Sequence, residues 1–267
     1  MGQKLPYDSR YWHNIQPPEL MDLSRRFEYD EDVLNLLRKW LRLSEGASKT
    51  IVEVGCGSGY FTEKLLEMAP GSKITAVEPD DVLREHAERR LAPKVDFVEG
   101  TAECIPLPSN FSDLTVCHIV INNLLDVHKA VAEMSRVTKM GGIVAAIEPS
   151  GGGFHYYPDA ELNELNEKAH LAYGRGVWNL RTKLMDYSRD IKQKKARYPE
   201  IFYSCGLSKI EAHGLLSVFL LSDPRRDPEE LFRWLEARST LQEKDKARLS
   251  TILERGGFQR SLIEEYH

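Results

Sequence analysis

The chain has 267 residues, of which 42% are hydrophobic and 29% charged, a balance typical of a soluble globular protein rather than a disordered chain. Its formal net charge of −5 at pH 7 gives no global basic field that would attract nucleic acid or an anionic membrane. We therefore expect a small-molecule or protein substrate, and a length sufficient for one domain with a substantial insertion.

The cysteine pattern argues against metal and disulfide chemistry. Cys56, Cys104, Cys117 and Cys205 are widely separated and form no C-x-x-C pair, so we predict neither a zinc site nor a disulfide framework. No run approaches about 18 consecutive apolar residues, and the N-terminal segment lacks the order of charges and apolar residues found in signal peptides. These observations predict a cytoplasmic protein without a metal, a membrane partner or a nucleic-acid partner.

The most informative stretch is 50–59, with the sequence TIVEVGCGSG. An apolar, β-rich run ends there in three alternating glycines, Gly55, Gly57 and Gly59, and a helical pattern begins at Tyr60, which predicts a strand, a tight turn and a helix. Without Cβ atoms, the turn lets a ligand lie against main-chain N–H groups at the start of the helix. The glycine spacing fits neither the dinucleotide fingerprint nor the P-loop.

Two acidic residues accompany this turn. Glu53 lies just before the first glycine, where its charge would repel a pyrophosphate and favour a cationic amine or sulfonium. Glu78 follows the predicted strand 73–77, about 20 residues beyond the turn, where doubly wound sheets place an acid that accepts both hydroxyls of a ribose. The pair predicts an adenosine-type ligand, and Glu78 alone does not distinguish S-adenosylmethionine from NAD.

The segment from Glu53 to Gly59 resembles the first motif of class I S-adenosylmethionine-dependent methyltransferases, and the similarity continues to about residue 150. The chain is similar to the small-molecule branch that includes the ubiquinone and menaquinone biosynthesis methyltransferases. The resemblance implies an α/β fold: a Rossmann-like, mostly parallel sheet of seven strands with helices on both faces and a helical cap between strands 5 and 6. It also implies S-adenosyl-L-methionine as the cofactor.

The loop 99–108 resembles the adenine-contacting loop of this family, with Thr101 at the position where an aspartate is usual. The Thr101 hydroxyl is able to bond the adenine edge, and Glu103 or main-chain groups replace the missing carboxylate. The full set of cofactor contacts that the resemblance and the turn predict is Glu53, Gly55, Cys56, Gly57, Gly59, Glu78, Pro79, Thr101, Ala102, Glu103 and His118.

Four residues are candidates for a general base, in case the methyl acceptor must lose a proton. In order of preference they are His118, His155, Tyr157 and Glu148. His118 ends the predicted fourth strand and Glu148 the fifth, whereas His155 and Tyr157 lie in a polar aromatic cluster. A purely structural role for His118 is an equally good interpretation. Because methyl transfer depends mainly on alignment and exclusion of water, few catalytic side chains are needed.

Periodicity and turn residues predict the remaining elements. The expected helices are 19–26, 30–43, 80–91, 126–139 and 201–206, and the expected strands are 95–98, 111–118, 143–147, 209–212 and 215–221.

We divide the chain into four parts. Residues 1–29 form an N-terminal strap, 30–148 and 198–222 the methyltransferase core, 149–197 a helical cap insertion, and 223–267 a helical tail that packs on the core or on a second subunit. The predicted function is methyl transfer from S-adenosylmethionine to a small-molecule acceptor, the methylated atom (O, N, S or C) being undetermined. The alternatives are methylation of a protein, a non-catalytic adenosyl-ligand sensor or scaffold, and an NAD-dependent oxidoreductase.

Overall fold

The structure is a computed structural model that describes residues 9–14, 17–26, 29–43, 48–124, 126–148, 198–215 and 227. The chain divides into two compact units, one formed by Met1–Ser150 with Ser188–Leu215 and the other by Gly151–Tyr187 with Leu216–His267. The fold described below is that of the first unit.

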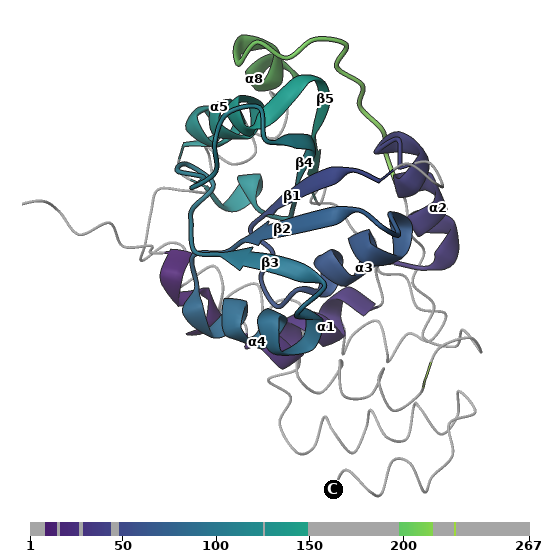
Figure 1. The fold of residues 1–267 in the computed structure, drawn as a ribbon, viewed down its shortest axis with the longest axis vertical. Coiled ribbons are helices and arrows are strands. Elements are labelled where there is room, and N and C mark those ends of the chain that lie inside the picture. The colour runs from purple at the N-terminus through teal and green to yellow at the C-terminus, as the bar shows by residue number, and fades with distance from the viewer. Residues whose placement is uncertain are drawn as a thin grey trace, which may run out of the picture. The chain divides into compact units, whose positions relative to one another are not determined.

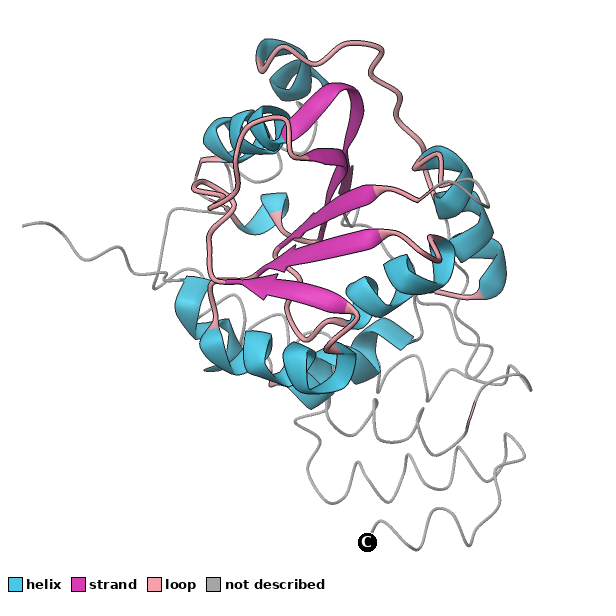
Figure 2. Ribbon diagram, in the orientation of Figure 1, coloured by secondary structure: helices cyan, strands magenta, loops and turns pink. Residues whose placement is uncertain are grey.

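The centre of this unit is a parallel sheet with the strand order β3-β2-β1-β4-β5 (Figures 1 and 2). The strands are β1 (Thr50–Val54), β2 (Lys73–Val77), β3 (Val95–Val98), β4 (Ser112–His118) and β5 (Thr138–Ile147). The order reverses between β1 and β4, and in doubly wound sheets such a switch point is where ligands bind beyond the carboxyl ends of the strands. The predicted α/β, Rossmann-like parallel architecture is confirmed.

Helices connect the strands and cover both faces of the sheet (Figure 1). They are α1 (Pro18–Arg26), α2 (Glu31–Trp40), α3 (Tyr60–Met68), α4 (Asp81–Leu91), α5 (Val127–Val137) and α8 (Tyr198–Ser204), with 3-10 helices η1 (Ser9–Asn14) and η2 (Ile121–Asn123). Asp30 caps α2, because its carboxylate accepts the Val33 N–H at 2.9 Å. The helices predicted before residue 140 are thus confirmed, within a few residues at their ends.

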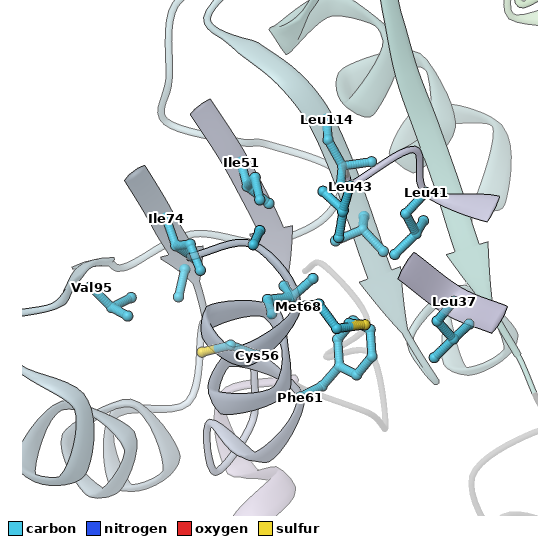
Figure 3. Close-up of a cluster of buried hydrophobic side chains, with 14 of the residues drawn as sticks. Leu37, Leu41, Leu43, Ile51, Cys56, Phe61, Met68, Ile74, Val95 and Leu114 are labelled. Carbon is cyan, nitrogen blue, oxygen red and sulfur yellow. The ribbon is translucent and has the colours of Figure 1, made fainter. Parts of the chain in front are cut away.

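Two hydrophobic clusters occupy the two faces of the sheet. Ile51, Ile74 and Leu114 project from three adjacent strands toward α2 and α3, where Phe61 and Met68 complete the packing (Figure 3). On the other face, the intervening residues of the same strands, whose side chains point the opposite way, pack against α5 and α8. Strands buried on both faces read as continuous apolar runs, which is why β1 was visible in the sequence.

Two expectations about strands were wrong. The described residues form five strands, not seven: 209–212 lies outside the sheet and is exposed, with Ile210 37% accessible, and most of 215–221 falls outside the described residues, as does the predicted cap 149–197. β5 begins at Thr138 rather than 143, because Thr138 already pairs with Ser112 of β4; its hydroxyl also shares a hydrogen bond with that of Thr115 at 2.6 Å.

Candidate functional site

The glycine turn after β1 has a backbone that only glycine adopts easily. Gly55, Gly57 and Gly59 have φ values of +73°, +56° and +84°. The N–H groups of Gly55 and Cys56 both donate to the Val77 carbonyl, at 2.7 and 3.2 Å, which fastens the turn to the end of β2. The Cys56 side chain is buried, and burial raises the pKa of its thiol well above the usual range.

The space above the turn is closely lined. A Cβ added to Gly55 would lie 2.5 Å from Val120 Cγ2, and one added to Gly57 would lie 2.8 Å from the Met21 thioether. At Gly59 the same atom would meet Ala87 of α4 at 2.8 Å. The three glycines are therefore required by close approach as well as by φ.

Glu53 on β1 is buried with no exposed surface, and neither of its carboxylate oxygens has a hydrogen-bond partner. Burial raises its pKa to about 8; the nearby Thr62 hydroxyl opposes this rise, and the charge of Glu78 adds to it. A carboxyl group in this state is costly unless it gains a partner. A cationic group of a ligand would supply that partner.

Glu78 follows β2 and is 5% exposed. Its Oε2 accepts the Gly57 N–H at 2.8 Å and its Oε1 accepts the Asp80 N–H at 3.0 Å. Burial raises the pKa of Glu78 to about 7, although these two hydrogen bonds lower it. Each oxygen has one protein donor, and since a carboxylate oxygen has two acceptor sites, both oxygens retain capacity for a ribose hydroxyl.

Strand register brings Glu53, Glu78 and His118 to one face of the sheet. Glu53 lies opposite Ala76 of β2 and Val116 of β4, and side chains two residues apart on a strand share a face. Ala76 and Val116 both belong to the hydrophobic cluster beneath α3. Glu78 and His118 are two positions further along the chain from these residues, so their side chains project on that side as well. The two predicted acids and the predicted histidine thus occupy the same edge and the same face.

His118 ends β4 and is 8% exposed. Its Nε2 shares a hydrogen bond with the Tyr29 hydroxyl, and the Tyr29 and Phe61 rings lie 5.3 and 4.7 Å from the imidazole between centroids. Burial, and then the positive charge of Arg25, lowers the pKa of His118 well below its usual value, so the ring is neutral at pH 7. Sequence reasoning did not select Tyr29; its only signal was the abundance of aromatic residues in the strap.

The predicted adenine loop lies against the end of β2. The Glu78 N–H donates to the Val98 carbonyl at 3.1 Å, and a Cβ on Gly100 would approach Val77 Cγ1 to 2.9 Å. Thr101 forms an isolated antiparallel bridge with Cys104. Around it Ala102 is buried, while Pro79 and Glu103 are partly exposed. The loop and Glu78 are therefore neighbours, as the predicted site requires.

The described part of the strap packs on α4 and on the glycine turn. The His13 N–H and Nδ1 both bond Asp80, at 2.8 and 2.9 Å, and Asp22 accepts Arg90 Nη1 at 2.9 Å. The same Arg90 nitrogen donates to the Ser58 carbonyl at 3.0 Å. Arg90 thus ties α1 to the turn.

Glu148, directly after β5, has its carboxylate engaged by the turn that follows β4. Oε1 accepts the N–H groups of Val120 and Ile121, each at 2.9 Å, and Oε2 accepts Asn122 Nδ2 at 2.7 Å. The other two base candidates, His155 and Tyr157, lie outside the described residues.

No group of three or more His, Cys, Asp or Glu side chains able to hold a metal ion occurs within the part of the chain that the structure describes. Over the same residues, none of the helices has the length and apolar character needed to cross a membrane.

A parallel sheet of this order, with a glycine turn after its first strand and acids at the ends of two adjacent strands, is typical of nucleoside-binding α/β domains. Residues 52–146 match the model of the family described as "Methyltransferase domain". Over these residues the chain is similar to the methyltransferase family, in agreement with the resemblance to class I S-adenosylmethionine-dependent methyltransferases.

Curated proteins with sequence similarity to this chain are also methyltransferases. The chain is 24% identical over 160 residues to a malonyl-(acyl-carrier protein) O-methyltransferase of Serratia marcescens, covering 59% of this chain and 61% of that protein. It is 29% identical over 140 residues to a ubiquinone/menaquinone biosynthesis C-methyltransferase of Methylobacterium nodulans, covering 47% and 56%. The chain therefore spans less than two thirds of the length of each.

A solved S-adenosyl-L-methionine-dependent methyltransferase of Methanococcus maripaludis aligns with a TM-score of 0.50 and 20% identity, over 79% of this chain and 90% of that one. This likeness supports the fold alone. The cofactor of the domain class is S-adenosylmethionine. The residues present fit it: the unpartnered Glu53 suits its cationic groups, Glu78 has acceptor capacity for its ribose, and the glycine turn leaves main-chain atoms uncovered by a Cβ.

Proposed function

We propose that this chain transfers a methyl group from S-adenosylmethionine to a small-molecule acceptor. The single observation that carries the proposal is the buried, unpartnered carboxyl of Glu53 on the same sheet face as Glu78. A site for a pyrophosphate would not place a carboxyl group there, because its ionised form would repel the ligand and its ionisation would gain nothing from it, which argues against the NAD alternative. The small-molecule acceptor is favoured by the relative that acts in ubiquinone and menaquinone biosynthesis.

In this proposal, each part of the site has a separate task. Glu53 faces the cationic methionyl end of the cofactor and Glu78 accepts the ribose hydroxyls. The other predicted contacts come from the glycine turn, from the residue after Glu78, from the adenine loop and from the end of β4, namely Gly55, Cys56, Gly57, Gly59, Pro79, Thr101, Ala102, Glu103 and His118. When bound, the cofactor supplies an electrophilic methyl group on a sulfonium. The protein has to align the acceptor with that methyl group and exclude water.

Tyr29 and His118 form the proposed acid–base pair. The Tyr29 phenol takes the proton of the acceptor as it passes its own proton to His118 Nε2, with which it shares a hydrogen bond. The low pKa of His118 keeps the imidazole neutral at pH 7, so that Nε2 is available as an acceptor for the phenol O–H. His155 and Tyr157 stay predictions for the same task, since they lie outside the described residues.

The wider setting is also a proposal. We place the protein in the cytoplasm, because Cys56, Cys104, Cys117 and Cys205 are all free thiols, as expected in a reducing compartment. We assign the acceptor-binding role to the predicted cap 149–197. A homodimer through the predicted tail 223–267 is testable by light scattering.

The decisive experiment incubates the protein with methyl-labelled S-adenosylmethionine and a metabolite extract. Label in a low-molecular-weight product supports the proposal, whereas label in protein favours the protein-methylating alternative. Tight cofactor binding with no transfer in any extract would favour a sensor or scaffold. A chain that binds NADH and not S-adenosylhomocysteine would overturn the assignment.

A further inference from the structure

Both carboxylate oxygens of Glu148 accept hydrogen bonds, which oppose the rise in the pKa of Glu148 that its burial causes. The main-chain N–H groups of Val120 and Ile121 point to Oε1, each at 2.9 Å, and both the N–H and the side-chain amide of Asn122 point to Oε2, at 3.4 and 2.7 Å. Donors of this kind stabilise the ionised carboxylate and occupy its acceptor sites. The carboxylate thus organises the turn after β4.

The backbone of that turn includes an unfavourable conformation at Ile119, which the surrounding hydrogen bonds have to stabilise. Ile119 has a φ of +55°, a region that β-branched residues rarely enter. The Ile119 N–H donates to the Ile147 carbonyl at 2.8 Å, and Asn123 Nδ2 donates to the Ile119 carbonyl at 3.0 Å. Glu148 secures the next residues, so the turn is held by the end of β5 on both sides of Ile119.

A side chain of the 119–122 turn also lies against the glycine turn that follows β1. Val120 Cγ2 lies 2.5 Å from the position that a Gly55 Cβ would occupy, so this side chain fills the space beside Gly55. At the same residue, the Val77 carbonyl of β2 accepts the Gly55 N–H at 2.7 Å. Gly55 is therefore held between β2 and the turn that Glu148 secures.

We propose that Glu148 is a positioning residue for cofactor binding: its carboxylate holds the 119–122 turn so that Val120 fixes the glycine loop at Gly55. This inference rests on the proposed function, since the loop is the proposed cofactor cradle. It assigns Glu148 a task different from the proton transfer predicted from its place in the sequence.

The test compares dissociation constants for S-adenosylhomocysteine, measured by calorimetry on folded protein. Glu148→Gln replaces one acceptor oxygen by an amide donor that faces existing donors, and we expect binding to weaken about 10-fold or more. Val120→Ala should weaken binding by a smaller factor. In the double variant the effect of Glu148→Gln should shrink, because the contact through which it acts is gone.

A second readout separates positioning from proton transfer. If Glu148 positions the loop, the pH profile of kcat in Glu148→Gln keeps its shape while KM for S-adenosylmethionine rises. If Glu148 were the base, kcat would fall and its pH profile would lose a limb without a change in affinity, which would overturn the proposal.

A matched variant covers the case in which Glu148→Gln does not fold. Asn122→Ala removes only the side-chain donor to Oε2 and leaves the main-chain bonds in place. Weaker binding in Asn122→Ala and Val120→Ala supports the proposal, and unchanged binding in both overturns it. A wild-type protein that binds no S-adenosylhomocysteine would instead refute the proposed function, and the two failures are thus distinguishable.

Discussion

The Thr62 hydroxyl lies close enough to the Glu53 carboxyl to lower its pKa, yet both side chains are fully buried and neither completes a hydrogen bond. Thr62 belongs to α3, the helix that the glycine turn begins, and Glu53 to the strand that precedes it. The two residues thus lie on either side of the turn in the sequence, and both side chains are buried. A ligand cation that reached Glu53 would satisfy both oxygens at the proposed cofactor site.

Cofactor binding should release protons. In the free protein Glu53 is mainly protonated at pH 7, because burial raises its pKa to about 8, and a cationic ligand would favour its ionised form. Calorimetry at pH 7 in two buffers of different ionisation enthalpy should give different apparent enthalpies. Glu53→Gln should reduce that difference and leave the smaller contribution of Glu78. Equal enthalpies in both buffers for the wild type would contradict this account.

The free protein should lose stability as pH rises from about 4.5 to about 8. The unfolded chain has an ordinary Glu53 pKa near 4.5, so it releases its proton first, while the folded protein retains it up to about pH 8. The free energy of unfolding should therefore fall by up to about 1.4 kcal/mol per pH unit for this group. Urea titrations from pH 5 to 8 measure the slope, which Glu53→Gln should lessen. A slope that is the same in both proteins would refute the buried, protonated state.

Glu78→Ala should weaken cofactor binding by about 1.5–3 kcal/mol, the range for loss of a charged hydrogen-bond partner. The variant also frees the N–H groups of Gly57 and Asp80. The matched control is Glu85→Gln, an exposed residue of α4 that pairs with exposed Arg89 at 3.8 Å. Calorimetry with S-adenosylhomocysteine should separate the two, and equal affinity would remove Glu78 from the site.

Tyr29→Phe should lower kcat by about 100-fold or more if the phenol relays the proton of the acceptor, since general base catalysis has that magnitude. The ring and its packing against Phe61 are retained, so the melting temperature should change little. His118→Asn should lower kcat to a similar extent, and the double variant should be no worse than either single one. Full activity in Tyr29→Phe would exclude the relay.

Gly59→Ala should destabilise the protein more than Gly71→Ala, although both glycines have nearly the same φ, +84° and +80°. The backbone strain, about 1–2 kcal/mol, is common to both. Only at Gly59 would the new Cβ meet Ala87, at 2.8 Å, whereas nothing lies within 4 Å at Gly71. Thermal melts measure the difference, and equal losses would contradict the tight packing of α4 on the turn.

The sequence was sufficient for the features that depend on local pattern. The apolar run of β1 and the glycines after it predicted the strand and turn, and the spacing alone predicted that Glu78 directly follows β2. The predictions that failed concern strands expected at the edge of the sheet and segments with weak sequence patterns. The segment 209–212 alternates like a strand but buries no face, so it has no packing to hold it in the sheet.

The hydrogen-bond partners of the site side chains could not be predicted from the sequence, for a different reason. Tyr29 and His118 are 89 positions apart, and Glu148 and Val120 are 28 apart, so their bonds exist only once the strands have aligned. Local spacing identified His118 and Glu148 as polar residues at strand ends. It carried no information about which donors the fold would direct at them.

The most direct measurement of the central claim is equilibrium dialysis of the protein against labelled S-adenosylmethionine, in parallel with Glu53→Gln and Glu78→Ala. The account predicts one bound cofactor per wild-type chain and a markedly weaker affinity in each variant. Absence of binding by the wild type, or equal binding by all three proteins, would contradict it.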